Sequence, residues 1–476
     1  MTLKTLSNKT VVTFIVSLAL FMDSLDTTII NTAIPAMARS LAVNPVDLKI
    51  ALISYLLSLA IFIPISGIIA DKFGVKRVFI FALAVFTLSS FWCGYSHTLT
   101  QLIIARSVQG IGGSLMLPLG RLIILRSFER HELIVAMNHV IMVVSIGLML
   151  GPFAGGLITD HLSWPWIFWV NIPVGLFNIV AAGLWLNDNF PRKSHPFDFL
   201  GFILFGGGLA VFTFSLSYLS ESAATTHFAL LLGASGILML MCYFFRARSQ
   251  RRPIIHTELF KIRTFRISVF GNLCARLGFG GVPFLLPLLL QIGLHYKALT
   301  SGLLLVPIAF GIIITKYVSA YILRFAGYKR MLLLNTILAG LFLWVFRIVD
   351  TETSLYTIAT LTFIFGCLAS IQYSGMNSLA YADISSDDQS AAISILSTIQ
   401  QLSQSFGVAV CALFLRYYST SLQLTPEVFH QTFYAMGALT ILSALIFIRL
   451  KPEDGHQLLR KDPETLGIST RKDFHH

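Results

Sequence analysis

Long apolar runs recur along the whole chain and restrict what it can fold into. A helix needs about 20 apolar residues to cross roughly 30 Å of hydrocarbon. By this measure fourteen spans are predicted: 11–34, 48–70, 77–96, 100–124, 134–158, 163–187, 198–218, 226–246, 266–292, 300–323, 329–349, 354–378, 390–416 and 427–449. Because 55% of the 476 residues are hydrophobic and only 12% are charged, a water-soluble globule is excluded. The sequence predicts an all-α polytopic membrane protein.

The basic residues are concentrated in the loops on one side of these spans. If both termini are cytoplasmic, most lysines and arginines fall in cytoplasmic loops, above all in segment 246–266. The opposite side carries Arg39, Lys49, Lys297, Arg347 and Arg416. Positive charge marks the cytoplasmic loops of membrane proteins. The net charge of +12 therefore indicates topology, with both termini in the cytoplasm and the lipid bilayer as surroundings, and it does not indicate nucleic-acid binding.

Four stretches together resemble a known family. The loop after the second span contains Gly67, Asp71, Lys72, Gly74, Lys76 and Arg77, and it is echoed by "RFAGYKR" at 324–330. It is similar to the loop between helices 2 and 3 of the major facilitator superfamily. "LIIARSVQGIGGS" (102–114), "GLMLGPFAGG" (147–156) and "SWPWIFWVNIPVG" (163–175) extend the resemblance to the fourteen-helix drug:proton antiporter branch. Val75, Pro165 and the additional acid Asp23 depart from the usual pattern of that branch.

The resemblance implies a fold and a division of the chain. The expected fold is the major facilitator fold, with two six-helix halves plus two extra central helices. The expected parts are an N-terminal half at 1–190, two linker helices with a basic cytoplasmic loop at 191–265, a C-terminal half at 266–450 and a cytoplasmic tail at 451–476. The basic loop is interpreted as a structural linker, with a regulatory role as the alternative.

The resemblance also implies a function. It predicts a proton-coupled exporter of small organic molecules in the inner (plasma) membrane, working by alternating access, without a cofactor and with a monomer as the expected assembly. No Walker loop, paired His/Glu helix motif or Gly-x-Ser-x-Gly is present, and the five cysteines lack metal-ligand spacing, so an enzyme and a metal site are not expected. A proton-coupled importer, a channel and a scaffold remain as alternatives.

Two of the stretches predict moving or sealing parts. Asp71 can bond a helix N-terminus or a basic side chain when the cytoplasmic side closes, while Gly67 and Gly74 allow tight backbone approach. In the fifth span, small residues clear one face for helix packing, and a proline loosens the backbone: Gly147, Gly151, Pro152, Gly155 and Gly156. The family interpretation is a seal against leak that characterises exporters, and plain tight packing explains the same residues.

Two carboxylates lie inside the first apolar span, where a charge is costly. Asp23 and Asp26 are three residues apart and share a helical face. At 1.5 Å per residue, Asp26 lies about 24 Å along its helix and Arg106 about 9 Å along a helix that enters from the other side. The two are therefore at comparable depth. We predict that Asp26 carries the proton, with Arg106 as modulator and Asp23 as second carrier or substrate contact; a static ion pair is the alternative.

Polar residues in other spans are candidates for the wall of a substrate cavity. The predicted set is Asn31, Gln109, Asn272, Arg276, Gln291, Tyr373, Asn377, Gln401 and Gln404. Hydrogen bonding between helices would explain each of them equally well. Because Arg106, Arg276 and Lys316 stand against Asp23 and Asp26, the charges lean toward a substrate with an acidic group. The resemblance favours multidrug efflux, and a dedicated exporter of an acidic metabolite or siderophore stays open as the alternative.

Overall fold

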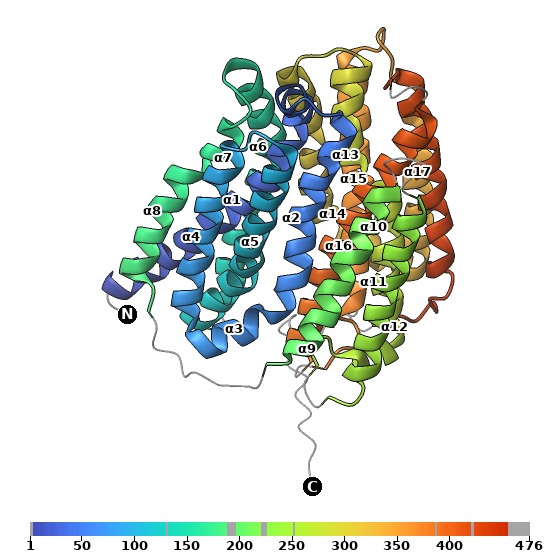
Figure 1. The fold of residues 1–476 in the computed structure, drawn as a ribbon. Helices are drawn as coiled ribbons and strands as arrows, with labels where there is room; N and C mark the ends of the chain where they lie inside the picture. Colours follow the sequence, from blue (N-terminus) through green and yellow to red (C-terminus); the bar gives the residue numbers. More distant parts are fainter. Residues whose placement is uncertain are drawn as a thin grey trace.

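The computed structural model describes residues 3–129, 132–187, 197–219, 226–250, 253–385, 388–419 and 423–455. Throughout these ranges every regular element is a helix, and 14 helices are long and apolar enough to cross a membrane. They form one bundle, in which the described chain begins at the same end as α3 and α9 (Figure 1). The all-α fold with 14 spans is confirmed.

The helices of the first part of the chain pack into a bundle around α1 and α5. They are α1 (Leu3–Leu41), η1 (Pro45–Leu48), α2 (Lys49–Phe62), η2 (Ile63–Ile65), α3 (Ser66–Phe73), α4 (Val75–Gly94), α5 (Leu99–Ser127), α6 (Leu133–His161), α7 (Trp166–Trp169) and α8 (Asn171–Trp185). A core of buried side chains between residues 12 and 186 joins α1, α2, α4, α5, α6 and α8.

The remaining helices follow the same pattern of long spans and short connections. They are α9 (Phe199–Phe202), η3 (Ile203–Gly207), α10 (Gly208–Leu219), α11 (Thr226–Ala247), η5 (Thr257–Lys261), α12 (Arg263–Phe279), α13 (Val282–Leu288), η6 (Leu289–Gly293), α14 (Ala298–Val345), η7 (Phe346–Ile348), α15 (Leu355–Ala380), α16 (Gln389–Tyr418) and α17 (Pro426–Phe447). The connection 188–196, which carries Arg192 and Lys193, and the tail beyond residue 455 lie outside the described residues.

One element, α14, contains two of the predicted spans. The spans 300–323 and 329–349 correspond to Ala298–Lys316 and Tyr321–Ile348. Between the two predicted spans, Gly327 has φ 71°, a left-handed conformation that side chains disfavour, so the helix axis changes direction there. Gly327 belongs to "RFAGYKR", the stretch that echoes the loop at 70–77.

The hairpin of α10 and α11 packs over α2 and α16, which belong to opposite ends of the sequence. Edge-to-face ring contacts fix the hairpin and the preceding α9 there: Phe202 of α9 lies 5.4 Å from Phe62, and Phe212 of α10 lies 5.6 Å from Phe406, between ring centroids. Aromatic pairs in this geometry contribute more than their buried area. The two extra helices therefore bridge the first and last parts of the chain.

Polar contacts between the two parts are found at the end of the bundle opposite to α3. The Asp160 carboxylate accepts hydrogen bonds from the backbone N–H groups of Ala298 and Leu299, at 3.2 and 2.8 Å. Arg416 pairs with Asp47 at 3.6 Å. These contacts hold the helices together at that end.

Candidate functional site

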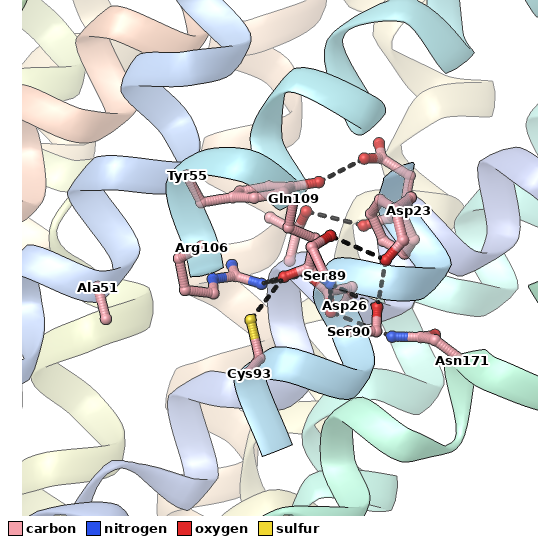
Figure 2. A network of polar contacts seen from close by, with 12 residues as sticks. Asp23, Asp26, Ala51, Tyr55, Ser89, Ser90, Cys93, Arg106, Gln109 and Asn171 are labelled. Carbon is pink, nitrogen blue, oxygen red and sulfur yellow. Dashed lines mark hydrogen bonds and ion pairs between the residues drawn. The ribbon is translucent and has the colours of Figure 1, made fainter. Parts of the chain in front are cut away.

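A buried ion pair joins α1 to α5 in the middle of the first bundle. Arg106 Nη1 donates to Asp26 Oδ2 at 2.5 Å, and neither side chain has any exposed surface. Figure 2 shows the pair within a network of polar side chains from α1, α2, α4, α5 and α8. Breaking such a pair by removing one partner leaves an uncompensated buried charge.

Two further side chains donate hydrogen bonds to the Asp26 carboxylate. Gln109 Nε2 and Asn171 Nδ2 donate to Asp26 Oδ1 at 2.9 and 3.1 Å. Gln109 Nε2 also donates to Ser90 Oγ at 2.9 Å, and Gln109 Oε1 accepts from Arg106 at 2.6 Å. Hydrogen bonds to the charged form stabilise a carboxylate. The Asp26 carboxylate is thus surrounded by donors from Arg106, Gln109 and Asn171.

Arg106 lies between aromatic rings, with part of its hydrogen-bonding capacity unused. Its guanidinium carbon is 4.1 Å from the centroid of Tyr55 and 5.6 Å from that of Phe168. Both distances allow a cation–π interaction. Its Nε and Nη2 atoms are buried without a hydrogen-bond partner among the described residues.

Tyr55 connects the ion pair to the second acid of α1. Its hydroxyl group donates to Asp23 Oδ1 at 2.5 Å, while its ring covers Arg106. Asp23 is half-buried, one helical turn from the fully buried Asp26. The two acids thus differ in environment, although they share a helical face.

A cavity with about 360 Å³ of empty space adjoins this network. It lies between helices from both parts of the chain, and its wall consists of Thr27, Asn31, Leu52, Tyr55, Leu56, Arg106, Pro283, Phe284, Gln404 and Val408. The structure therefore brings the predicted Asn31 and Gln404 together beside Arg106. Gln404 also donates to the Gly280 carbonyl at 2.6 Å.

The other predicted wall residues lie apart from this cavity wall. Arg276 donates from Nε to Asn272 at 3.3 Å, and its guanidinium lies 3.9 Å from the Tyr373 ring centroid. Gln291 donates to the Thr32 carbonyl at 2.9 Å, so it joins α1 to η6.

The two predicted wall residues of α16, Gln401 and Gln404, differ in their contacts. Asn377 accepts a hydrogen bond from Gln400 at 2.9 Å, whereas the predicted Gln401 makes no hydrogen bond to the described residues. On α14, the Lys316 side chain is exposed and takes no part in the buried network.

The loop 67–77 makes contacts within the first bundle. Lys76 Nζ donates to the Gly183 carbonyl at 2.8 Å, and Gly74 turns the chain from α3 into α4 with φ 94°. Within the part of the chain that the structure describes, Asp71 has no hydrogen-bond or ion-pair partner. A Cβ atom at Gly67 would meet nothing within 4 Å, so the close backbone approach expected there is not present in this conformation.

Lys72 and Arg77, the remaining basic residues of that loop, are exposed. The Lys72 ammonium lies 5.3 Å from the Phe73 ring centroid.

The glycines of α6 lie against two different helices. Cβ atoms at Gly147, Gly151 and Gly155 would fall 2.1, 1.8 and 2.3 Å from atoms of α1. A Cβ at Gly156 would fall 2.4 Å from the Ala298 carbonyl of α14, and Pro152 approaches Gly302 of the same helix. One short stretch therefore packs against both parts of the chain.

Several residues of the network were missed by sequence reasoning. Tyr55, Ser90 and Asn171 contact the predicted residues directly. Asn171 lies in the stretch "SWPWIFWVNIPVG", where a polar side chain among apolar residues was a usable signal. Asp160 follows the glycines of α6 and lies three residues before the next predicted span. Nothing in that position indicated a partner at residue 298.

Replacing Asp160 with alanine is expected to weaken the contact between α6 and α14. The change removes the acceptor of two backbone N–H groups at the start of α14, and the loss of such a cap costs about 0.5–2 kcal/mol. Thermal unfolding of the purified protein would measure it. His161→Ala, at the neighbouring position in the last turn of α6, is the control. Equal melting temperatures for the two variants would contradict this role.

Comparison with protein families gives one match that covers most of the chain. The family model described as Major Facilitator Superfamily matches residues 16–408 and 268–475. Two relatives named "Putative multidrug resistance protein MdtD" are each 36% identical to this chain. The one from Enterobacter sp. (strain 638) aligns over 93% of this chain and 94% of its own length, and the one from Escherichia fergusonii over 96% and 97%.

Solved structures with low sequence identity share the fold. A bacterial homologue of the human lysosomal transporter Spinster, in an inward-facing and unoccupied conformation, gives a TM-score of 0.63 at 13% identity and covers 96% of this chain and 99% of its own. The nucleoside transporter NupG gives 0.60 at 13% identity, covering 93% and 100%.

Proposed function

Because this chain belongs to the Major Facilitator Superfamily, we propose that it exports small organic molecules in exchange for protons by alternating access. The family and the MdtD relatives support a multi-pass membrane transporter of the multidrug-efflux type. The direction of transport and its coupling to protons are proposed in addition.

One observation carries the proposal: the buried pair of Asp26 and Arg106 beside a cavity between the two parts of the chain. Ionisable residues within membrane spans are expensive and mark ion or substrate pathways. Arg106 borders the cavity, while Asp26 lies behind it. A change in the charge of Asp26 would therefore alter the net charge that a substrate meets at the cavity wall.

Protonation of Asp26 would cancel its attraction for Arg106. The guanidinium would then seek other acceptors, and its unused Nε and Nη2 donors already lack partners in the described structure. Asp23, bonded to Tyr55, would be the nearest alternative carboxylate. Exchange of the proton between these acids would couple the position of Tyr55 to the charge of the cavity wall.

The gate and the division of the chain complete the proposal. Asp71 is free to bond another helix when the side of α3 closes, and the contacts of Asp160 at the opposite end would then open. We place this machinery in the inner (plasma) membrane, with both termini cytoplasmic and with six-helix halves at 1–190 and 266–450.

Reconstituted vesicles test coupling and direction together. Purified protein in liposomes would be given a pH gradient of either sign, and a fluorescent cationic drug would be followed. We expect drug movement opposite to the imposed proton movement, with loss of movement when an ionophore collapses the gradient. Movement of drug and proton in the same direction would favour an importer. Gradient-independent movement would contradict coupling.

A dedicated exporter of an acidic metabolite or siderophore is the second candidate, and Arg276 favours it. The side chain lies inside α12 and stacks on Tyr373, and no acidic side chain among the described residues pairs with it. A guanidinium without a carboxylate partner can bind one supplied by a substrate.

Replacing Arg276 with glutamine should therefore separate substrate classes. If an acidic group binds here, losing one charge-assisted hydrogen bond lowers its transport about tenfold, while cation transport is unchanged. Comparing metabolites in cells and medium, beside survival on cationic drugs, would measure both effects. Arg276→Lys, which keeps the charge, is the control. Equal losses for both substrate classes would indicate a structural role.

A further inference from the structure

A second and larger cavity lies at the end of the bundle where the described chain begins. It has about 770 Å³ of empty space and is formed by the ends of α1, α4, α5 and α8. Lys9, Lys76 and Arg126 line it, together with Trp185. We propose that this cavity binds the phosphate headgroup of an anionic phospholipid. The proposal does not rest on the transport function.

The charges around the cavity favour an anion. Lys9 is paired with Glu132 at 2.5 Å, so its charge is partly balanced within the protein. Lys76 uses one of its three donors on the Gly183 carbonyl, which leaves two for a ligand. Arg126 adds a planar guanidinium, the group that matches phosphate geometry best. Lys76 and Arg126 thus add positive charge to the cavity wall beside the pair of Lys9 and Glu132.

The backbone contributes positive potential from the start of α4. Val75 and Lys76, its first two residues, line the cavity. The N-cap residue Gly74 has no side chain that could accept hydrogen bonds from this turn. Uncapped N–H groups and the helix dipole make such a position suitable for an anion. Because side-chain cations and helix N-terminus converge, the site fits a phosphate group.

The rim of the cavity distinguishes a lipid from free phosphate. Trp185 is 47% exposed and Leu184 is 70% exposed on α8. Deeper along the same helices, the exposed rings of Phe14 and Phe177 meet at 6.3 Å and cover the seam between α1 and α8. Tryptophan is enriched at headgroup level, with apolar side chains below it. Acyl chains would lie along this seam while the headgroup enters the cavity.

Native mass spectrometry of the full-length protein in detergent tests the proposal. The protein would be titrated with phosphatidylglycerol, phosphatidylcholine and inorganic phosphate. We expect preferential phosphatidylglycerol binding that Arg126→Gln weakens about fivefold, as one surface charge contributes to anionic lipid binding. Arg330→Gln, an exposed arginine beyond Gly327 on α14, should leave it unchanged.

A second pair of variants leaves Arg126 and its contacts unchanged. Asn187 is an exposed residue of the cavity wall, so Asn187→Glu should repel the headgroup without disturbing the core. Ser249→Glu, exposed after α11, adds the same charge elsewhere. We expect Asn187→Glu to weaken phosphatidylglycerol binding about fivefold and Ser249→Glu to leave it unchanged. The proposal would be overturned if the two variants of either pair, Arg126→Gln with Arg330→Gln or Asn187→Glu with Ser249→Glu, changed lipid binding equally. Displacement of the lipid by equimolar phosphate would also overturn it.

Discussion

Replacing Asp26 with asparagine is expected to reduce transport driven by a pH gradient to background. The carboxamide has nearly the shape of the carboxylate but cannot bind or release the proton. Its oxygen can still accept from Gln109 and Asn171, so the local packing is preserved. The amide nitrogen would meet Arg106 Nη1, and this contact replaces an ion pair with two opposed donors.

The same change should lower stability measurably. Removing one partner of a buried pair costs about 3–5 kcal/mol, because the remaining charge is uncompensated. The additional substitution Arg106→Gln should restore part of this stability without restoring transport. Melting temperature and vesicle transport would be measured on the same preparations, so loss of folding and loss of coupling can be told apart.

A matched control exists at the edge of the bundle. Asp47 also pairs with an arginine, Arg416, but at 3.6 Å and with 30% of its side chain exposed. Surface pairs contribute little, so Asp47→Asn should change stability by less than about 1 kcal/mol and leave coupling intact. Coupled transport by the Asp26 variant at the level of this control would show that Asp26 is not the proton carrier.

The depth of the two buried charges could be predicted because helix rise is constant. Counting 1.5 Å per residue from each membrane entry placed Asp26 and Arg106 at a common level, and the structure shows them in contact. The spans were predictable for a related reason. Hydrocarbon allows only long apolar helices, so hydropathy alone locates them.

The rotation and neighbours of each helix were harder to predict. On α16, Gln401 was predicted to line the cavity, yet its neighbour Gln400 donates to Asn377, and Gln404 donates to the Gly280 carbonyl. One residue corresponds to about 100° of rotation, so a small error in the assigned face changes the partner. Tyr55 was missed because its importance depends on two other helices, α1 and α5, that meet beside it.

Replacing Gly156 with leucine is expected to block closure at the end of the bundle opposite to α3. Even a Cβ atom here would lie 2.4 Å from the Ala298 carbonyl oxygen, and a Cβ atom at Gly302 of α14 would lie 2.2 Å from the Pro152 carbonyl oxygen. Backbones that touch in this way cannot accommodate a side chain without moving apart. Overpacking of a tight contact costs about 1–3 kcal/mol. If alternating access requires this contact, transport stops.

Cysteine labelling would show whether the helices separate. Ser301 is fully buried next to Gly302, and Ser301→Cys in a background without native cysteines changes little volume. We expect a membrane-impermeant maleimide to label this cysteine faster when Gly156 is leucine. Gly183→Leu, at an exposed glycine with nothing within 4 Å, is the control and should leave labelling slow. If the cysteine stays protected in both variants and transport continues, close approach of α6 and α14 is packing without a role in the cycle.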